Sequence, residues 1–187
     1  MPIKTVKDHF HDHFSGNLIS RHLNYYFLNS NENKSELIDQ ELELRTFNIG
    51  DIDKCAKLFK EVFSDYPWYD NWISFNQVRN YLIELIENPV FEGFLAYDDK
   101  EIVAVCLGHK RSWWMGKEFC IDEFYVANKM QGNGIGTKLM DYVKDSLIKE
   151  DYTRLVLLTN KEIPAEEFYI KNGFYTNQDR INMINEL

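Results

Sequence analysis

The fold is decided by residues 119–144, FCIDEFYVANKMQGNGIGTKLMDYVK. Residues 119–126 are an alternating, β-branched and aromatic run, which is typical of a buried strand. A glycine cluster follows, and apolar residues then recur at helical spacing over residues 137–147. The segment therefore predicts a strand, a tight loop and a helix.

The loop has the features of a phosphate-binding site. Gly132, Gly134 and Gly136 lack a Cβ atom, so the backbone can turn with φ > 0 and a polyanion can approach the amide groups. The N–H groups at the start of a helix also carry partial positive charge, which favours phosphate oxygens. Gly136-Thr137-Lys138 has the wrong order for a Walker loop, and the Gly-x-Gly-x-Gly spacing does not fit a dinucleotide fingerprint. We expect a different nucleotide-like ligand.

The sequence Gln131-Gly132-Asn133-Gly134-Ile135-Gly136 resembles the Gln/Arg-x-x-Gly-x-Gly/Ala motif of the GNAT N-acetyltransferases. In that family the loop binds the pyrophosphate of acetyl-coenzyme A. A second block, Pro164-Ala165-x-x-Phe168-Tyr169-x-x-Asn172-Gly173-Phe174, resembles the other hallmark of the family. Aminoglycoside 6′-N-acetyltransferases are among the members that the chain resembles.

The resemblance implies acetyl-coenzyme A as co-substrate and an α/β fold of the GNAT type, with a mixed, mostly antiparallel central sheet flanked by helices. The backbone of two strand residues is expected to pair with the pantetheine arm, and two asparagines are expected to orient that arm or the tyrosine. The expected coenzyme-binding residues are Tyr125, Val126, Gln131, Gly132, Asn133, Gly134, Ile135, Gly136, Thr137, Asn160 and Asn172.

The remaining patterns follow the family's order of elements. Strands are predicted at residues 42–47, 91–97, 102–110, 119–126 and 154–159, with two more from residue 174 and at 180–187. Helices are predicted at residues 51–63, 74–87, 137–147 and 165–172, and turns at 98–101 and 112–117. These elements form a predicted acetyltransferase domain at residues 42–187.

Residues 1–41 are polar and carry four of the five histidines, and we expect them to form a helical arm with a linker. His9, His11 and His13 are two residues apart and share no helix face, which argues against a preformed metal site. The arm is expected to pack on its own domain or to form a homodimer.

Composition narrows the possible partners. A chain of 187 residues with 44% hydrophobic content suits one domain, and its net charge of −9 disfavours nucleic acid and anionic membranes while fitting a cationic substrate. Cys55, Cys106 and Cys120 show no metal-ligand spacing and are expected to be reduced core residues. The reduced cysteines indicate a cytoplasmic protein, and because no apolar run approaches ~18 residues we expect no membrane span.

Acetyl transfer from a thioester to an amine needs a base for the incoming ammonium and an acid for the departing thiolate. Asp122 and Glu123 are the candidate bases, although strand alternation sends them to opposite faces unless a bulge intervenes. The resemblance slightly favours Asp122, and at least one of the two acids has the alternative role of a buried ion-pair partner. Tyr169 is the implied general acid, because the family's tyrosine at this place lies near the coenzyme sulphur.

Residues 65–72, DYPWYDNW, are the candidate acceptor-binding loop. Acids among aromatic rings can hold an organic cation by charge and by cation–π contact, and the expected contacts are Trp68, Tyr69, Asp70 and Trp72. The alternative is that the aromatic rings fasten a surface loop to the core.

The predicted function is direct transfer of acetyl, within a ternary complex, to a primary amine of a small cationic acceptor that resembles an aminoglycoside or a polyamine. The alternatives are an acetyltransferase for protein N-termini or peptides, and a catalytically inactive sensor that binds coenzyme A.

Overall fold

The computed structural model describes residues 42–187, so the predicted helical arm and its histidines lie outside the described residues. Five strands form one sheet in the order β1-β2-β3-β4-β5. They are β1 (Glu43–Thr46), β2 (Phe91–Asp98), β3 (Glu101–Trp113), β4 (Gly116–Val126) and β5 (Tyr152–Leu157). Neighbouring strands are antiparallel except β4 and β5, which are parallel. The predicted mixed, mostly antiparallel sheet is confirmed.

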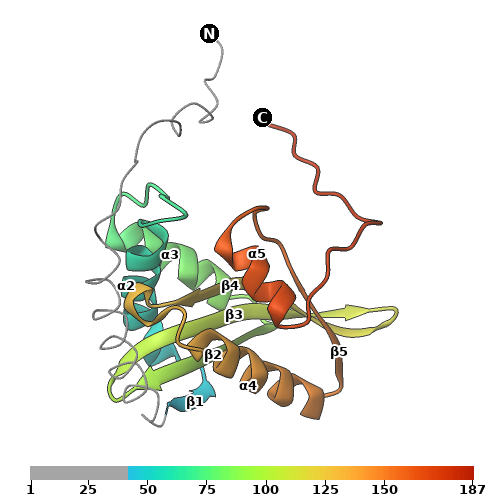
Figure 1. Ribbon diagram of the computed structural model, residues 1–187, viewed down its shortest axis with the longest axis horizontal. Coiled ribbons are helices and arrows are strands. Elements are labelled where there is room, and N and C mark those ends of the chain that lie inside the picture. Colours follow the sequence, from blue (N-terminus) through green and yellow to red (C-terminus); the bar gives the residue numbers. More distant parts are fainter. Residues whose placement is uncertain (1–41) are drawn as a thin grey trace, which may run out of the picture. The chain divides into compact units, whose positions relative to one another are not determined.

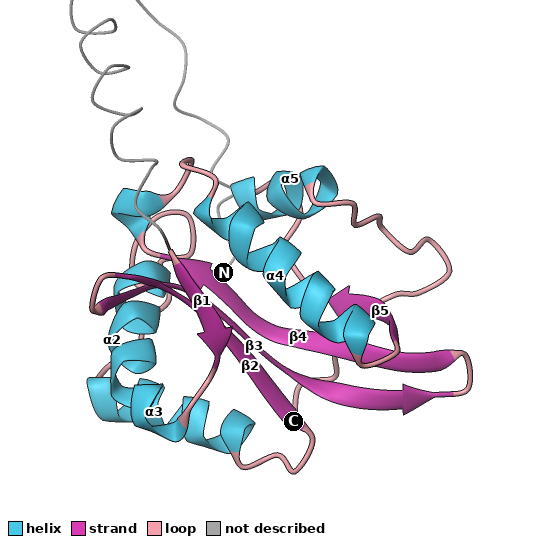
Figure 2. Cartoon of the chain, turned by 90° about the horizontal axis from the view of Figure 1, so that it is seen from below, coloured by secondary structure: helices cyan, strands magenta, loops and turns pink. Residues whose placement is uncertain are grey.

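Helices cover both faces of this sheet (Figure 1). Figure 2 shows α2 (Ile52–Phe63) and α3 (Phe75–Ile86) on one face, and α4 (Ile135–Lys149) and α5 (Pro164–Lys171) on the other. Short 3₁₀ turns, η1 (Ile49–Asp51) and η2 (Asn128–Met130), precede α2 and α4. In residues 42–187 no helix is long and apolar enough to cross a membrane.

Side chains that alternate along the strands pack into two hydrophobic cores, one on each face of the sheet. Leu95, Val105 and Leu107 pack under α2 and α3. Phe94, Cys106 and Phe119 point the other way and pack under α4. β2 and β3 are therefore apolar on both sides, as expected for a sheet with helices on both faces.

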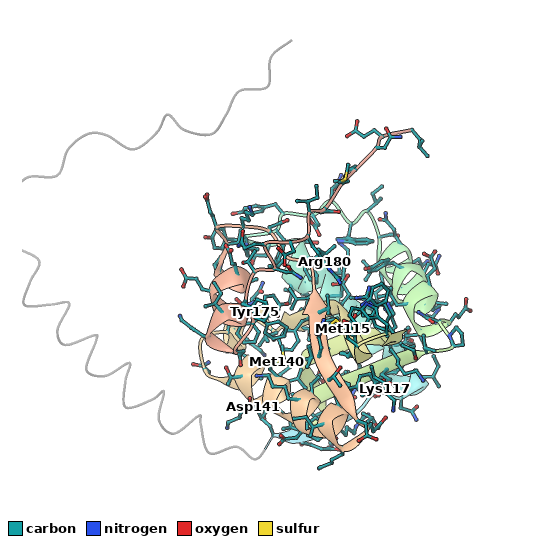
Figure 3. All side chains as sticks on the ribbon, turned by 90° about the vertical axis from the view of Figure 1, so that its right-hand side faces the viewer. Met115, Lys117, Met140, Asp141, Tyr175 and Arg180 are labelled. Carbon is teal, nitrogen blue, oxygen red and sulfur yellow. The ribbon has the colours of Figure 1, made fainter. Side chains whose placement is uncertain are left out.

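The hairpin between β3 and β4 is longer than predicted. Instead of a turn at residues 112–117, β3 continues to Trp113 and β4 begins at Gly116. The sequence does not predict strands there, because charged residues stand where an apolar pattern is expected. Arg111 Nε donates to Glu118 Oε2 at 2.9 Å, and with this partner Glu118 is only 1% exposed. Figure 3 labels Met115 and Lys117 at this hairpin.

The two predicted C-terminal strands were wrong. Within the described residues, none after Lys171 belongs to a strand. A strand needs a neighbour for its backbone groups and its apolar face, and here the apolar side chains stay in solvent. Tyr175, Ile181, Met183 and Ile184 are at least 80% exposed. In the described part of the chain, β5 is therefore one of the two edge strands of the sheet, with β1 the other.

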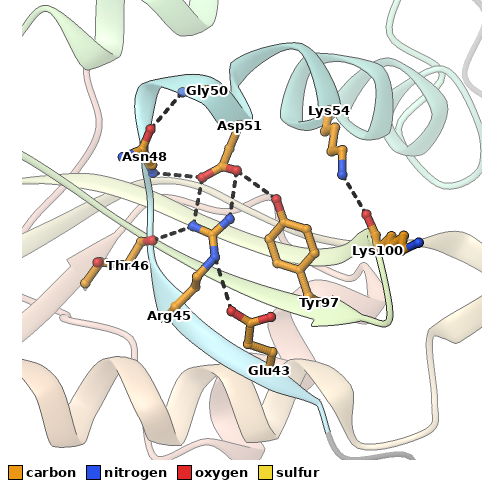
Figure 4. Close-up of polar contacts among 9 residues, drawn as sticks. All are labelled: Glu43, Arg45, Thr46, Asn48, Gly50, Asp51, Lys54, Tyr97 and Lys100. Carbon is orange, nitrogen blue, oxygen red and sulfur yellow. Dashed lines mark hydrogen bonds and ion pairs between the residues drawn. The ribbon is translucent and has the colours of Figure 1, made fainter.

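An ion pair fixes the start of α2 against the sheet (Figure 4). Arg45 on β1 binds both carboxylate oxygens of Asp51, at 2.8 and 2.9 Å. The same carboxylate accepts hydrogen bonds from the Tyr97 hydroxyl at 2.7 Å and the Asn48 backbone N–H at 2.8 Å. The Arg45 hydrogen bonds lower the pKa of Asp51 to about 2.

We expect Asp51→Asn to lower the free energy of unfolding at pH 7 by about 2 kcal/mol, because the Arg45 charge loses its partner. The pKa of Asp51 is lower folded than unfolded, where it is about 3.9. The stabilisation is therefore complete above about pH 4 and is lost as pH falls toward 2. Urea unfolding at several pH values measures this difference.

Asp53→Asn is the matched control, since its carboxylate is 67% exposed and its ion pair with Arg79 should contribute less than about 1 kcal/mol. Equal losses for the two variants, or a loss for Asp51→Asn that persists unchanged at pH 3, would contradict this account.

Candidate active site

The central strands separate where the candidate acids lie. Pairing between β4 and β5 runs from Lys117 with Tyr152 to Ile121 with Leu157. β4 continues to Val126, so in the described ladder its last residues have no partner on the β5 side. Backbone groups on that side have no strand partner and can bind something else, although the Val126 carbonyl accepts from Gln131 Nε2. This is where the sequence predicted backbone contacts from Tyr125 and Val126.

A β-bulge lies at the same place. Glu123 pairs with Leu107 and Ile121 with Gly108, so Asp122 is the extra residue of β4. A bulge cancels one step of strand alternation, which brings Asp122 and Glu123 onto the same face. Gly108 is required opposite the bulge, because a Cβ there would lie 2.3 Å from the Cys120 carbonyl oxygen.

The two acids have different partners on this face. Glu123 Oε1 accepts a hydrogen bond from the Tyr81 hydroxyl of α3. Asp122 Oδ2 lies 2.8 Å from Nδ1 of His109 on β3, and these two side chains are 28% and 31% exposed. Asp122 is thus already paired at the surface.

Burial raises the pKa of Glu123 to about 7, and the charges of Asp122 and Asp70 add to the effect. The Tyr81 hydrogen bond opposes it by stabilising the carboxylate. A carboxyl group that titrates near neutrality suits a general base, because both of its protonation states are populated.

Tyr169 projects from α5 into an aromatic cluster with ring centroids 5.3 Å from Phe168, 5.4 Å from Phe174 and 6.3 Å from Phe124. Burial raises its pKa well above the ordinary value, and the charge of Glu123 acts in the same direction. The phenol therefore keeps its proton at neutral pH.

The glycine loop leads into α4. Gly132 and Gly134 have φ of +75° and +80°, and a Cβ on either would meet nothing within 4 Å. Gly136 is needed for another reason, since its Cβ would lie 3.1 Å from the Phe168 ring. An open, left-handed loop at a helix start fits a bound phosphate.

The other loop residues divide between structure and surface. Gln131 Nε2 donates to the Val126 carbonyl at 3.0 Å and to Asn128 Oδ1 at 3.1 Å, so it braces the loop. Ile135 is buried under the sheet, Asn133 is half-buried, and Thr137 is exposed.

The two asparagines expected near the coenzyme lie in different settings. Asn172 is 8% exposed, and its Nδ2 donates to the Phe168 carbonyl at 2.8 Å. Its own carbonyl accepts from Lys144 Nζ at 2.7 Å, so Asn172 closes the end of α5. Asn160 is exposed beyond β5.

The candidate acceptor loop is fastened by its tryptophans. Trp68 packs 5.3 Å from Phe63, and Trp72 packs 5.2 Å from Phe59, as in the alternative interpretation of these rings. Tyr69 is 69% exposed, and Asp70 is exposed too. A hollow of about 290 Å³ is lined by Asp70, Asn71, Trp72 and Gln77.

Comparison with known proteins agrees with this geometry. Residues 53–174 match the model of the acetyltransferase (GNAT) family. The chain belongs to the GNAT acetyltransferase family. This supports the predicted N-acetyltransferase activity, and acetyltransferases of the GNAT fold use acetyl-coenzyme A. A comparison with curated proteins gave no match.

Solved GNAT structures show the same fold at low identity. An aminoglycoside acetyltransferase, meta-AAC0020 from an uncultured soil metagenomic sample, solved with sisomicin, has a TM-score of 0.64 at 17% identity, covering 80% of this chain and 99% of its own. AAC(6′)-Iy, solved with a bisubstrate analogue, has a TM-score of 0.62 at 12% identity, covering 79% of this chain and 99% of its own. A possible acetyltransferase from Clostridium difficile 630 has a TM-score of 0.66 at 18% identity, covering 78% of this chain and 98% of its own.

Sequence reasoning missed Tyr81 and His109. Tyr81 is separated from Glu123 by 42 residues, and His109 from Asp122 by 13. Neither belongs to a motif, and both are brought to the acids by the packing of α3 and the register of β3. Finding Tyr81 requires the packing of α3 on the sheet, and finding His109 requires the register of β3.

Glu123→Gln should raise the free energy of unfolding above pH 7 and have little effect at pH 5. The folded pKa near 7 lies above the unfolded value of about 4.3, so ionising Glu123 costs stability as pH rises through that window. We expect a gain of about 2 kcal/mol at pH 8, measured by denaturant unfolding at both pH values. Equal effects at pH 5 and pH 8 would show that ionisation of Glu123 does not lower the free energy of unfolding.

Proposed function

We propose that this GNAT protein transfers the acetyl group of acetyl-coenzyme A directly to a primary amine of a small cationic acceptor. The observation that carries the proposal is the half-buried Glu123, whose pKa of about 7 suits a base, at the open end of β4. The open glycine loop before α4 supports pyrophosphate binding in the same region.

Glu123 is the proposed base in preference to Asp122, which the sequence slightly favoured. Asp122 is already paired with His109. Glu123 is the more buried acid, and burial raises its pKa to about 7.

In the proposed reaction Glu123 takes a proton from the acceptor ammonium, and the freed lone pair attacks the thioester carbonyl. The C–N bond forms, the C–S bond breaks, the thiolate takes the phenolic proton of Tyr169, and the second ammonium proton leaves the new amide nitrogen for solvent. The proton on Glu123 then passes to solvent, and solvent returns one to Tyr169. Both groups begin in the required protonation state, since Tyr169 stays neutral and Glu123 is ionised at slightly alkaline pH.

The proposed acceptor is cationic because acidic groups gather near Glu123. Asp70 borders the hollow beside Trp72, and its charge adds to the burial that raises the pKa of Glu123. A polyamine or an aminoglycoside carries several amines, of which one can react while another binds Asp70. The exposed ring of Tyr69 can contact such a molecule.

Thiol release from acetyl-coenzyme A tests the reaction on a panel of aminoglycosides, polyamines, amino acids and short peptides. We expect turnover on one cationic amine and a loss of about 10²-fold or more in kcat for Tyr169→Phe, because the thiolate loses its acid. Tyr175→Phe is the control, since Tyr175 is 83% exposed. Turnover on peptides alone would favour the N-terminal acetyltransferase, and wild-type kcat in Tyr169→Phe would remove Tyr169 from the mechanism.

Gly134→Ala should weaken coenzyme A binding about tenfold or more in calorimetry. Gly134 has φ +80°, and an alanine resists that left-handed conformation by about 1–2 kcal/mol, so the loop would leave its phosphate-binding shape. Gly50→Ala, in the 3₁₀ turn before α2, is the control and should leave affinity unchanged. Undiminished affinity in Gly134→Ala would place the coenzyme elsewhere, and tight binding without any turnover would favour the sensor.

A further inference from the structure

Tyr81 joins the candidate base to the acceptor loop. It lies on α3, and its hydroxyl donates a hydrogen bond to Glu123 Oε1 on β4. Its ring packs 5.4 Å from Trp72 in the loop and 5.7 Å from Phe59 on α2. A side chain held on two sides by aromatic rings has little rotational freedom, so the position of its hydroxyl is fixed.

The loop that orients this ring is itself anchored. Lys60 Nζ on α2 donates to the Trp72 carbonyl at 3.0 Å, and Ser74 Oγ caps α3 by accepting from the Gln77 N–H at 3.1 Å. Among buried side-chain polar atoms of the described residues, Trp72 Nε1 alone has no hydrogen-bond partner. Trp72 therefore serves packing against Tyr81 at the cost of an unsatisfied donor.

The other groups around Glu123 act through charge. The negative charge of Asp122 on β4, which pairs with His109 on β3, raises the pKa of Glu123. Asp70 in the acceptor loop acts in the same direction. Glu84 is a further acid on α3, and its negative charge raises the pKa of Tyr81. Asp122 and Asp70 oppose ionisation of Glu123, whereas the Tyr81 hydroxyl is the group that stabilises its carboxylate.

We propose that Tyr81 is the positioning residue of the acetyl-transfer site, holding Oε1 of Glu123 so that Oε2 is turned toward the acceptor ammonium. The role in catalysis rests on the proposed function. The hydrogen bond and its effect on Glu123 do not, and they can be measured without an acceptor.

The experiment is a ¹³C NMR titration of the Glu123 carboxyl group in full-length protein labelled at glutamate Cδ, with the signal assigned by its loss in Glu123→Gln. We expect a pKa of about 7 in the wild type. In Tyr81→Phe we expect a value about one unit higher, because a hydrogen bond to a charged group is lost. Tyr142→Phe is the control, since Tyr142 lies on α4 and packs in the core beneath the opposite face of the sheet, so Glu123 should titrate as in the wild type.

An unchanged Glu123 pKa in a folded Tyr81→Phe protein would overturn the proposal, as would an equal shift in Tyr142→Phe. Should Tyr81→Phe not fold, 3-fluorotyrosine incorporated at position 81 keeps the ring and makes its hydroxyl a stronger donor. The Glu123 pKa should then fall, and a rise or no change would count against the proposal. Failure of the whole acceptor panel would count against the proposed function but leave this titration intact.

Once an acceptor is known, the kinetic consequence is a lower kcat with little change in its KM for Tyr81→Phe, because the base is misplaced while the acceptor still binds. In a Glu123→Gln background, adding Tyr81→Phe should cause no further loss. A further loss in that background would show that Tyr81 acts otherwise than through Glu123.

Discussion

After Ile121, β4 gains one extra residue and loses its β5 partner at the same point of the sheet. The extra residue, Asp122, turns Glu123 toward α3, where burial and the Tyr81 hydroxyl set its protonation. The lost partner leaves backbone groups of β4 without a strand partner on the β5 side, where the pantetheine arm is expected. One local irregularity therefore accounts for both halves of the proposed site, and Gly108 makes it possible by giving the bulge room.

Helix packing then brings the remaining groups to this point from separate parts of the chain. Gly136 lets α4 approach the Phe168 ring of α5, which places Tyr169 beside Phe124 of β4. On the opposite face Trp72 and Phe59 hold Tyr81 against Glu123. The proposed acid and base thus come from opposite faces of the sheet, and the charge of Glu123 raises the pKa of Tyr169. The Arg45–Asp51 pair fixes the start of α2 and so supports the aromatic cluster indirectly.

Periodicity predicted the sheet and the helices well where one face is apolar, as in α2 and α4. It failed at the β3–β4 hairpin, where Arg111 and Glu118 pair with each other and conceal a strand. It also failed after Lys171, because an alternating segment forms a strand only where it pairs with an edge strand of a sheet. The glycine loop and Tyr169 were visible as motifs. The side-by-side placement of Asp122 and Glu123 was not, since a bulge depends on the register of two strands.

The most direct test is the pH dependence of kcat/KM for acetyl transfer, compared between the wild type and Glu123→Gln. We expect the wild-type rate to rise with pH through a midpoint near 7, as Glu123 ionises. The variant should be at least about 10²-fold slower and lack that limb. A variant that keeps the wild-type rate and midpoint would show that Glu123 is not the base, and the role proposed for the bulge in catalysis would be wrong.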